Sequence, residues 1–207
     1  MTAHLTSTAT FNFVVTVLSH AAAAYRGHRG TPPSAEILVN ALLQAEKSAK
    51  QQRLTYPFES LSGKWQLCFV TGTNKVRKRG GILLGKGFYI PKFITIHASF
   101  NAILEQDSGR GEIVNQVEYG PVLFKFTGPV QYLSKKNLLA FDFNHMLISL
   151  FGRVVYNRPI HFGKVKTEDF YNQSIAKLPF FGFFLVTEDI IAARGRGGGL
   201  ALWIRET

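Results

Sequence analysis

The feature that most constrains the fold is a change in the spacing of apolar residues near residue 61. From there the spacing is two: Trp65, Leu67 and Phe69 alternate with Lys64 and Gln66, as in a strand with one buried face. Similar patterns, separated by turn-forming residues, predict further strands at 81–85, 93–104, 112–119, 122–126, 130–133, 137–143, 146–156, 180–187, 190–193 and 200–205. So many short strands predict a mainly β protein, an antiparallel barrel or sandwich.

The first quarter of the chain has helical periodicity instead. Apolar side chains recur every three or four positions over 11–25, and Pro32 and Pro33 before Ser34 form a start signal for a second apolar stripe at 37–45. We therefore expect two amphipathic helices within residues 1–55 and a β-barrel within residues 56–207. The helices need a surface to cover, such as the barrel wall or mouth. The apolar stretch 11–24 is too short and too polar to span a membrane, so no transmembrane segment is expected.

The segment 194–199, Arg-Gly-Arg-Gly-Gly-Gly, lies between two apolar runs. An RGG-like segment can bind nucleic acid, whereas a tight turn uses glycine for its positive φ angles. Because the flanking runs at 190–193 and 200–205 have strand character, we expect a hairpin. Nucleic acid is not an expected partner, since the chain has no recognised nucleic-acid-binding module.

Four phenylalanines crowd residues 180–184. On a strand they cannot all face one side, so those on the second face need a ligand, the N-terminal helices or a membrane to cover them. Together with the first strand they define the candidate contacts of a lipophilic ligand: Trp65, Leu67, Phe69, Phe180, Phe181, Phe183 and Phe184. A carrier of such a ligand is expected to have a hydrophobic cavity of roughly several hundred Å³.

The formal net charge of +11 indicates an anionic partner surface. No acidic residue lies between Glu59 and Glu105, and the basic residues of this stretch are densest at 75–79. The stretch is either a solvated loop or a docking patch for anionic lipid or an acidic protein. The docking residues would be Lys75, Arg77, Lys78 and Arg79.

Catalytic and metal-binding patterns are scarce. The six histidines share no metal-ligand spacing with one another or with Cys68, and the segment 80–87 lacks the Ser or Thr of a phosphate-binding loop. The acidic pairs at 168–169 and 188–189 are adjacent, so on a strand their side chains would point to opposite faces. Cys68, the only cysteine, lies in an apolar strand pattern and is expected to be a buried, inert thiol. We expect neither enzymatic activity nor a metal site.

Gly63-Lys64-Trp65, at the head of the first strand, is similar to the Gly-x-Trp motif of lipocalins. In that family the tryptophan closes the barrel floor and an arginine from near the last strand packs over it. Arg205 ends the last predicted strand here. The resemblance implies a lipocalin-like barrel in which Arg205 makes a cation–π contact with Trp65.

Both ends of the barrel region resemble the plastid lipid-associated protein (fibrillin) family of plants and cyanobacteria. The first match is Leu-Ser-Gly-Lys-Trp-Gln-Leu at 61–67 followed by Thr-Gly-Thr at 71–73, and the second is the acidic pair, Arg-Gly and glycine turn within 188–203. Two positions depart from the family pattern: Ile191 stands where an arginine is common, and Arg196 stands where an acid is common.

The resemblance implies binding or carriage of a carotenoid, quinone or other prenyl lipid at a thylakoid-type membrane, in a cyanobacterium or plastid. Two alternatives remain open. A bilin lyase-like pigment-assembly factor would need an acid or thiol inside the barrel, and its candidates are Glu112, Glu118, Asp142 and Cys68. A docking subunit would bind an acidic photosynthetic protein through the basic stretch, and its binding would weaken with salt.

Overall fold

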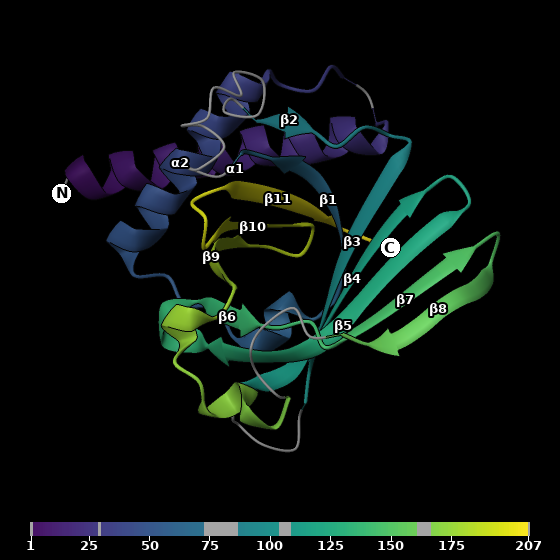
Figure 1. Ribbon diagram of the computed structural model, residues 1–207. Coiled ribbons are helices and arrows are strands. Elements are labelled where there is room, and N and C mark those ends of the chain that lie inside the picture. Colours follow the sequence, from purple (N-terminus) through teal and green to yellow (C-terminus); the bar gives the residue numbers. More distant parts are fainter. Residues whose placement is uncertain (1, 29, 73–86, 104–108, 161–166, 207) are drawn as a thin grey trace.

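The computed structural model describes residues 2–28, 30–72, 87–103, 109–160 and 167–206. They form a β-barrel with two helices against one side (Figure 1). The α-helices are α1 (Thr2–Arg26) and α2 (Ala35–Gln52), and the short 3-10 turns are η1 (Phe58–Leu61), η2 (Ser134–Lys136), η3 (Thr167–Asn172) and η4 (Ile175–Lys177). The strands are β1 (Gly63–Val70), β2 (Phe88–Tyr89), β3 (Ile94–Ala102), β4 (Arg110–Tyr119), β5 (Val122–Leu133), β6 (Leu138–Phe141), β7 (His145–Leu150), β8 (Arg153–Pro159), β9 (Phe180–Val186), β10 (Ile190–Gly195) and β11 (Leu200–Arg205).

Eight of the described strands close into an antiparallel barrel, in the order β1, β11, β10, β9, β6, β5, β4 and β3. The ring closes where β3 pairs with β1, with Trp65 opposite Ala98. The short strand β2 pairs with the last residues of β1. The mainly β barrel predicted from the spacing of apolar residues is therefore confirmed, as are the two helices that precede it.

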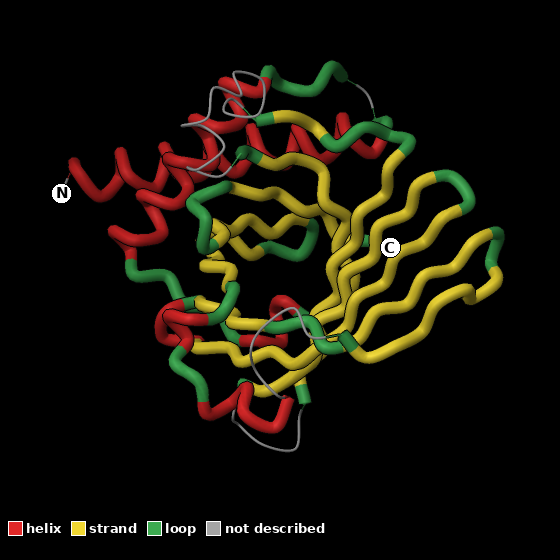
Figure 2. The backbone as a smooth tube through the Cα atoms, in the orientation of Figure 1, coloured by secondary structure: helices red, strands yellow, loops and turns green. Residues whose placement is uncertain are grey.

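The remaining strands extend one wall of the barrel. Along one edge of β5, residues 130–133 pair with β6 and residues 122–127 pair with β7. Because β5 changes partner in this way, β7 and β8 spread away from the closed ring. Figure 2 shows this wall projecting on the side of the molecule away from the helices. Strands β3, β4, β5, β7 and β8 together are termed the fan.

Two strand boundaries expected from the sequence are wrong. Gly128 does not break the run at 122–133 but lies inside β5, where a Cβ atom would come 2.0 Å from the Asp142 carbonyl oxygen of the neighbouring segment. Conversely, 146–156 is not one strand, since the chain turns at Phe151 and Gly152, both with positive φ. The strand expected at 81–85 lies outside the described residues.

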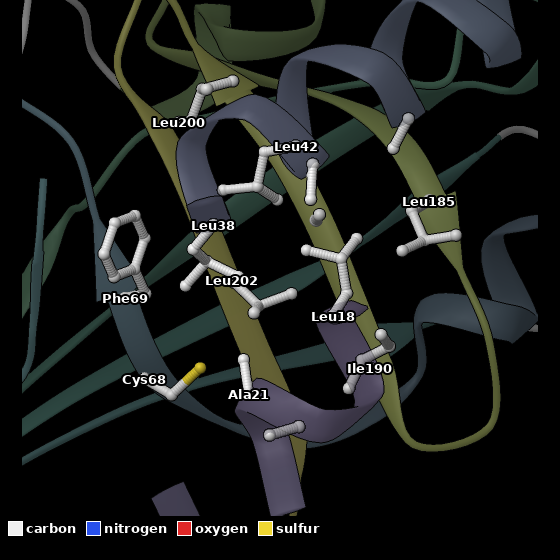
Figure 3. Packing of buried hydrophobic residues seen from close by; sticks show 14 of the residues in the cluster. Leu18, Ala21, Leu38, Leu42, Cys68, Phe69, Leu185, Ile190, Leu200 and Leu202 are labelled. Atoms are coloured by element: carbon white, nitrogen blue, oxygen red, sulfur yellow. The ribbon is translucent and has the colours of Figure 1, made fainter. Parts of the chain in front are cut away.

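Both helices cover the outer surface of β1, β9, β10 and β11. Helix α2 begins after Ser34, whose hydroxyl accepts a hydrogen bond from the Ile37 N–H at 3.4 Å. Helix α1 begins nearer the N-terminus than the apolar stripe predicted. Leu18 of α1 and Leu42 of α2 are fully buried against Ile190 and Leu202 of the sheet (Figure 3). No described helix combines the length and apolarity needed to cross a membrane.

The face assigned to Phe69 from alternation is wrong. The pairing of β1 with β11 shifts register between Leu67 and Phe69. Such a bulge turns the following side chain to the other face of the sheet. Phe69 therefore lies beside Cys68 in the cluster beneath the helices, and not beside Trp65 in the barrel (Figure 3).

Candidate functional site

One end of the barrel is closed by a tryptophan beneath an arginine. Trp65 is fully buried, and its Nε1 donates a hydrogen bond to the Leu61 carbonyl at 2.7 Å. The Arg205 guanidinium carbon lies 4.0 Å from the centre of the Trp65 ring. Arg205 also donates to the Ser62 carbonyl at 3.1 Å and to the Glu188 carbonyl. The cation–π contact implied by the Gly-x-Trp motif is therefore confirmed.

Gly63 is required by this arrangement. Its φ of +123° lies where residues with a side chain are strained, and a Cβ atom would come 2.7 Å from Arg205 Nη1. A side chain at residue 63 would displace the arginine from Trp65.

Above this floor, the closed end of the barrel is filled by aromatic side chains. Phe183 packs edge-on to Phe100 with ring centres 5.8 Å apart. The ring centres of Phe181 and Trp203 are 5.4 Å apart. Of the predicted ligand contacts, Trp65, Phe181 and Phe183 thus belong to the barrel interior and contact other side chains. Leu67 lies between this cluster and the one beneath the helices.

The other predicted ligand contacts lie outside the barrel. Phe69 and Phe184 are buried beneath the helices. Phe180 is partly buried and packs against a small cluster that contains Phe170 and Leu178. The helices therefore cover part of the second aromatic face of 180–184. The sequence had offered three possible covers for that face, namely a ligand, the helices or a membrane. The structure does not bring the seven predicted contacts together in one place.

The open end of the barrel is defined by strand register. Residues paired across antiparallel strands share a face, and Phe100 and Ile113, which pair, belong to the barrel interior. Two positions further along each strand, the same face continues into the fan, because side chains alternate with a period of two. The apolar members of this inward face, termed the mouth face, are Ile94, Ile96, Val117, Tyr119, Val122, Phe124, Phe126, Met146, Ile148, Leu150 and Tyr156. Ile94 and Ile96, at its edge, also pack against the cluster beneath the helices.

The mouth face becomes more exposed with distance from the core. Phe100 and Ile113 are buried, the row Ile96–Val117–Phe124–Ile148 is half-buried, and Tyr119 and Leu150 at the far end are 58% and 41% exposed. The opposite face of the same strands is largely polar, with residues such as Thr95, Gln116, Glu118, Lys125 and Ser149. The fan therefore has the alternation of a core-facing sheet, although the outer residues of its apolar side, Tyr119, Leu150 and Tyr156, are exposed.

A chain of aromatic contacts joins the closed end to the mouth face. Ring centres are 4.9 Å apart from Phe181 to Phe141, 5.4 Å from Phe141 to Phe143, and 5.8 Å from Phe143 to Phe126. Phe126 lies on β5 within the fan. The interior and the mouth face are thus one continuous apolar surface, filled at one end and open at the other.

Exposed apolar residues form a rim at the far end of the fan. Phe93 and Tyr119 pack edge-on with ring centres 6.0 Å apart. The Phe151 N–H donates to the Pro121 carbonyl at 2.9 Å, which places the β7–β8 turn beside the β4–β5 turn. Phe151 is 79% exposed. Aromatic side chains in such positions are typical of surfaces that meet a membrane or another protein.

The groups considered for chemistry do not gather at the mouth face. Glu112 and Glu118 occupy outward positions on β4 and are exposed. The Asp142 carboxylate accepts a hydrogen bond from the Phe143 N–H at 2.9 Å. Cys68 is fully buried beneath the helices, and burial raises the pKa of its thiol to about 12. Within the described residues, no group of three or more His, Cys, Asp and Glu side chains is placed to hold a metal ion.

The predicted docking patch, Lys75, Arg77, Lys78 and Arg79, lies outside the described residues. The hairpin predicted around 194–199 is confirmed, because the Gly195 N–H donates to Gly199 O and the Gly198 N–H to Gly195 O. Its Arg194 contacts Glu46 of α2, with Arg194 Nε 2.9 Å from Glu46 Oε1. This contact links the helix layer to the hairpin, and Lys50 Nζ, one turn further along α2, bonds the same carboxylate at 2.9 Å.

Sequence reasoning missed the mouth face and the Glu46–Arg194 pair. The alternation in 122–126 signals a strand with one apolar side and contains Phe124 and Phe126. It carries no information on whether another element covers that side. The pair joins residues 148 positions apart, which no local pattern detects.

In comparisons with known proteins, no family model, no curated protein and no solved structure matched this chain.

Proposed function

We propose that this protein binds a lipophilic small molecule on the mouth face of its barrel. The observation that carries the proposal is the row Val117–Phe124–Ile148–Tyr156: apolar, continuous with the barrel interior, and half-buried to exposed in the part of the chain that the structure describes. A bound ligand would remove this surface from water at about 25 cal/mol per Å² of apolar area. No chemical step is part of the proposal, which is a binding or carrier role.

The proposed place of action is a thylakoid-type membrane, and the proposed ligand a carotenoid, quinone or other prenyl lipid. The membrane is supported by the exposed rim of Phe93, Tyr119, Leu150 and Phe151, since aromatic rings are favoured at membrane–water interfaces. A rim of this kind would set the mouth against the bilayer, so that a ligand could pass between lipid and protein. The ligand class and the thylakoid rest on the resemblance to plastid lipid-associated proteins.

The proposal is tested with Nile red, a neutral lipophilic dye whose fluorescence rises in apolar surroundings. Phe124→Ser/Ile148→Ser replaces two neighbours of the mouth face, and Leu123→Ser/Leu147→Ser is the matched control on the outward face of the same strands. We expect the first variant to bind the dye about tenfold more weakly than the wild type, and the control to bind like the wild type. Equal affinity in both variants would contradict the proposal.

A further inference from the structure

A second candidate site lies outside the barrel, where α2 ends. It is a recess of about 540 Å³ between the end of α2, the turn from β5 to β6, and the β10–β11 hairpin. This volume falls within the range of small-molecule sites. Leu54, Phe180 and Phe184 supply apolar lining, and the basic lining residues are Lys50, Arg53, Lys135, Lys136, Arg194 and Arg196.

The recess carries an excess of positive charge. The lining contains six basic side chains and one acidic side chain, Glu46, so its formal charge is +5. That carboxylate is already paired with Arg194 and Lys50. Arg53, Lys135 and Lys136 have no carboxylate within 4.0 Å in the part of the chain that the structure describes. An anion in the recess would meet cations that have not been neutralised.

The walls of the recess are held in place by hydrogen bonds. Asn137 has a positive φ, its amide Nδ2 donates to the Leu54 carbonyl at 2.7 Å, and its Oδ1 accepts from the Tyr56 N–H at 2.9 Å. On the opposite wall, Arg194 Nη1 donates to the Gly198 carbonyl at 2.6 Å. Both walls are thus fixed before a ligand arrives, so the ordering cost of binding is confined to the exposed side chains of Arg53, Lys135 and Lys136.

An apolar recess adjoins the basic one. It has a volume of about 470 Å³, lies between α1 and β9, and is lined by Val15, Thr16, Leu54, Tyr56, Leu185, Val186 and Thr187. Leu54 belongs to both recesses. A basic pocket and an apolar groove that share a side chain match a ligand with an anionic head and an apolar chain.

We propose that the two recesses together bind an amphipathic anion, with a phosphate or carboxylate head near Arg53, Lys135 and Lys136 and an apolar chain over Leu54. The site is distinct from the mouth face and shares no residue with it, so neither proposal depends on the other. The head group is either that of a bilayer lipid or that of a soluble amphiphile, and the two sources have the same chemistry.

The test is calorimetric titration of the full chain with monomeric decyl phosphate. We expect the wild type to bind decyl phosphate more tightly than inorganic phosphate, which lacks the chain, and decyl maltoside, which lacks the charge. Lys135→Gln/Lys136→Gln should raise the Kd for decyl phosphate about fivefold. Arg153→Gln/Arg158→Gln on β8 removes the same charge outside the recess and should leave the Kd unchanged. Both pairs are exposed, so folding should be retained.

Failure of the wild type to bind decyl phosphate, or equal binding by wild type and Lys135→Gln/Lys136→Gln, would overturn this proposal. So would inorganic phosphate or decyl maltoside binding as tightly as decyl phosphate. Loss of binding in Phe124→Ser/Ile148→Ser would place the probe at the mouth and also overturn it. Competition by phosphatidylglycerol vesicles would identify a bilayer lipid as the source, and lack of competition a soluble amphiphile; both results agree with the site.

Discussion

The barrel has two extended apolar surfaces that differ in what covers them. The outer surface of β1, β9, β10 and β11 is buried beneath α1 and α2, and Leu18, Leu42 and Ile190 are fully buried there. The mouth face of the fan has the same alternation of apolar and polar residues, yet Leu150 and Tyr156 are exposed. Both surfaces have the pattern of a buried sheet face, but among the described residues only the first is buried throughout. This difference is the reason for proposing the mouth face as the binding surface, because exposed apolar faces are typical of interaction sites.

The largest expected effect separates the two surfaces by stability. Leu42→Ala, beneath the helices, should lower the free energy of unfolding by about 3 kcal/mol, because it leaves a cavity in a closed core. Ile148→Ala on the mouth face should lower it by less than about 1 kcal/mol, since that residue is half-exposed before unfolding. Urea denaturation of both variants measures this difference. Similar losses would show that the mouth face is packed like the covered surface.

A second prediction concerns what holds the helix layer to the barrel. Glu46→Gln should cost about 2 kcal/mol, below the usual range for a broken buried ion pair because the Arg194 side chain is 33% exposed and partly screened by water. The Arg194 guanidinium bonded to the carboxylate is the main cause that lowers the pKa of Glu46, Lys50 adds to it, and burial opposes it.

The pH dependence of stability checks the same pair. A carboxyl with a lowered pKa in the folded chain stabilises the fold above its ordinary pKa, and this contribution is lost as the pH falls through the folded pKa. Wild-type stability should therefore decline as the pH falls below about 4.5, the ordinary pKa of a glutamate. Glu46→Gln should lack this part of the decline. Parallel pH profiles for the two proteins would show that the pair does not hold the helices.

A smaller effect is expected at the barrel floor. Arg205→Gln removes the cation from the Trp65 ring and should cost about 1 kcal/mol. It should also shift the tryptophan fluorescence without altering Nile red binding, because the floor and the mouth are opposite ends of the apolar interior. Loss of dye binding in this variant would contradict the separation of the two ends.

Local patterns in the sequence predicted the parts of the fold that local physics determines. The period-two spacing, the start of α2 after Ser34 and the glycine hairpin all depend on neighbours in the chain, and the structure confirms them. The Trp65–Arg205 contact was accessible because a known motif links the two residues. The face of Phe69 was wrong because a bulge in the pairing with β11 breaks the alternation.

The candidate site was harder to predict because it depends on register between strands and on coverage. Phe124 and Ile148 meet because β5 and β7 pair in one register, and they stay only half-buried where β7 and β8 leave the closed ring. The recess at the end of α2 likewise assembles residues from three distant segments, including Arg53, Lys136 and Arg194. Composition and spacing describe each strand but not which surface remains open.

The most direct test of the account is to identify what the protein carries. Wild type, Phe124→Ser/Ile148→Ser and the outward-face control Leu123→Ser/Leu147→Ser would be purified from a photosynthetic host, extracted with organic solvent, and analysed by absorbance and mass spectrometry. The account predicts a stoichiometric carotenoid, quinone or other prenyl lipid in the wild type and the control, and its loss from the mouth-face variant. Equal cargo in all three proteins, or a folded wild type without cargo, would contradict it.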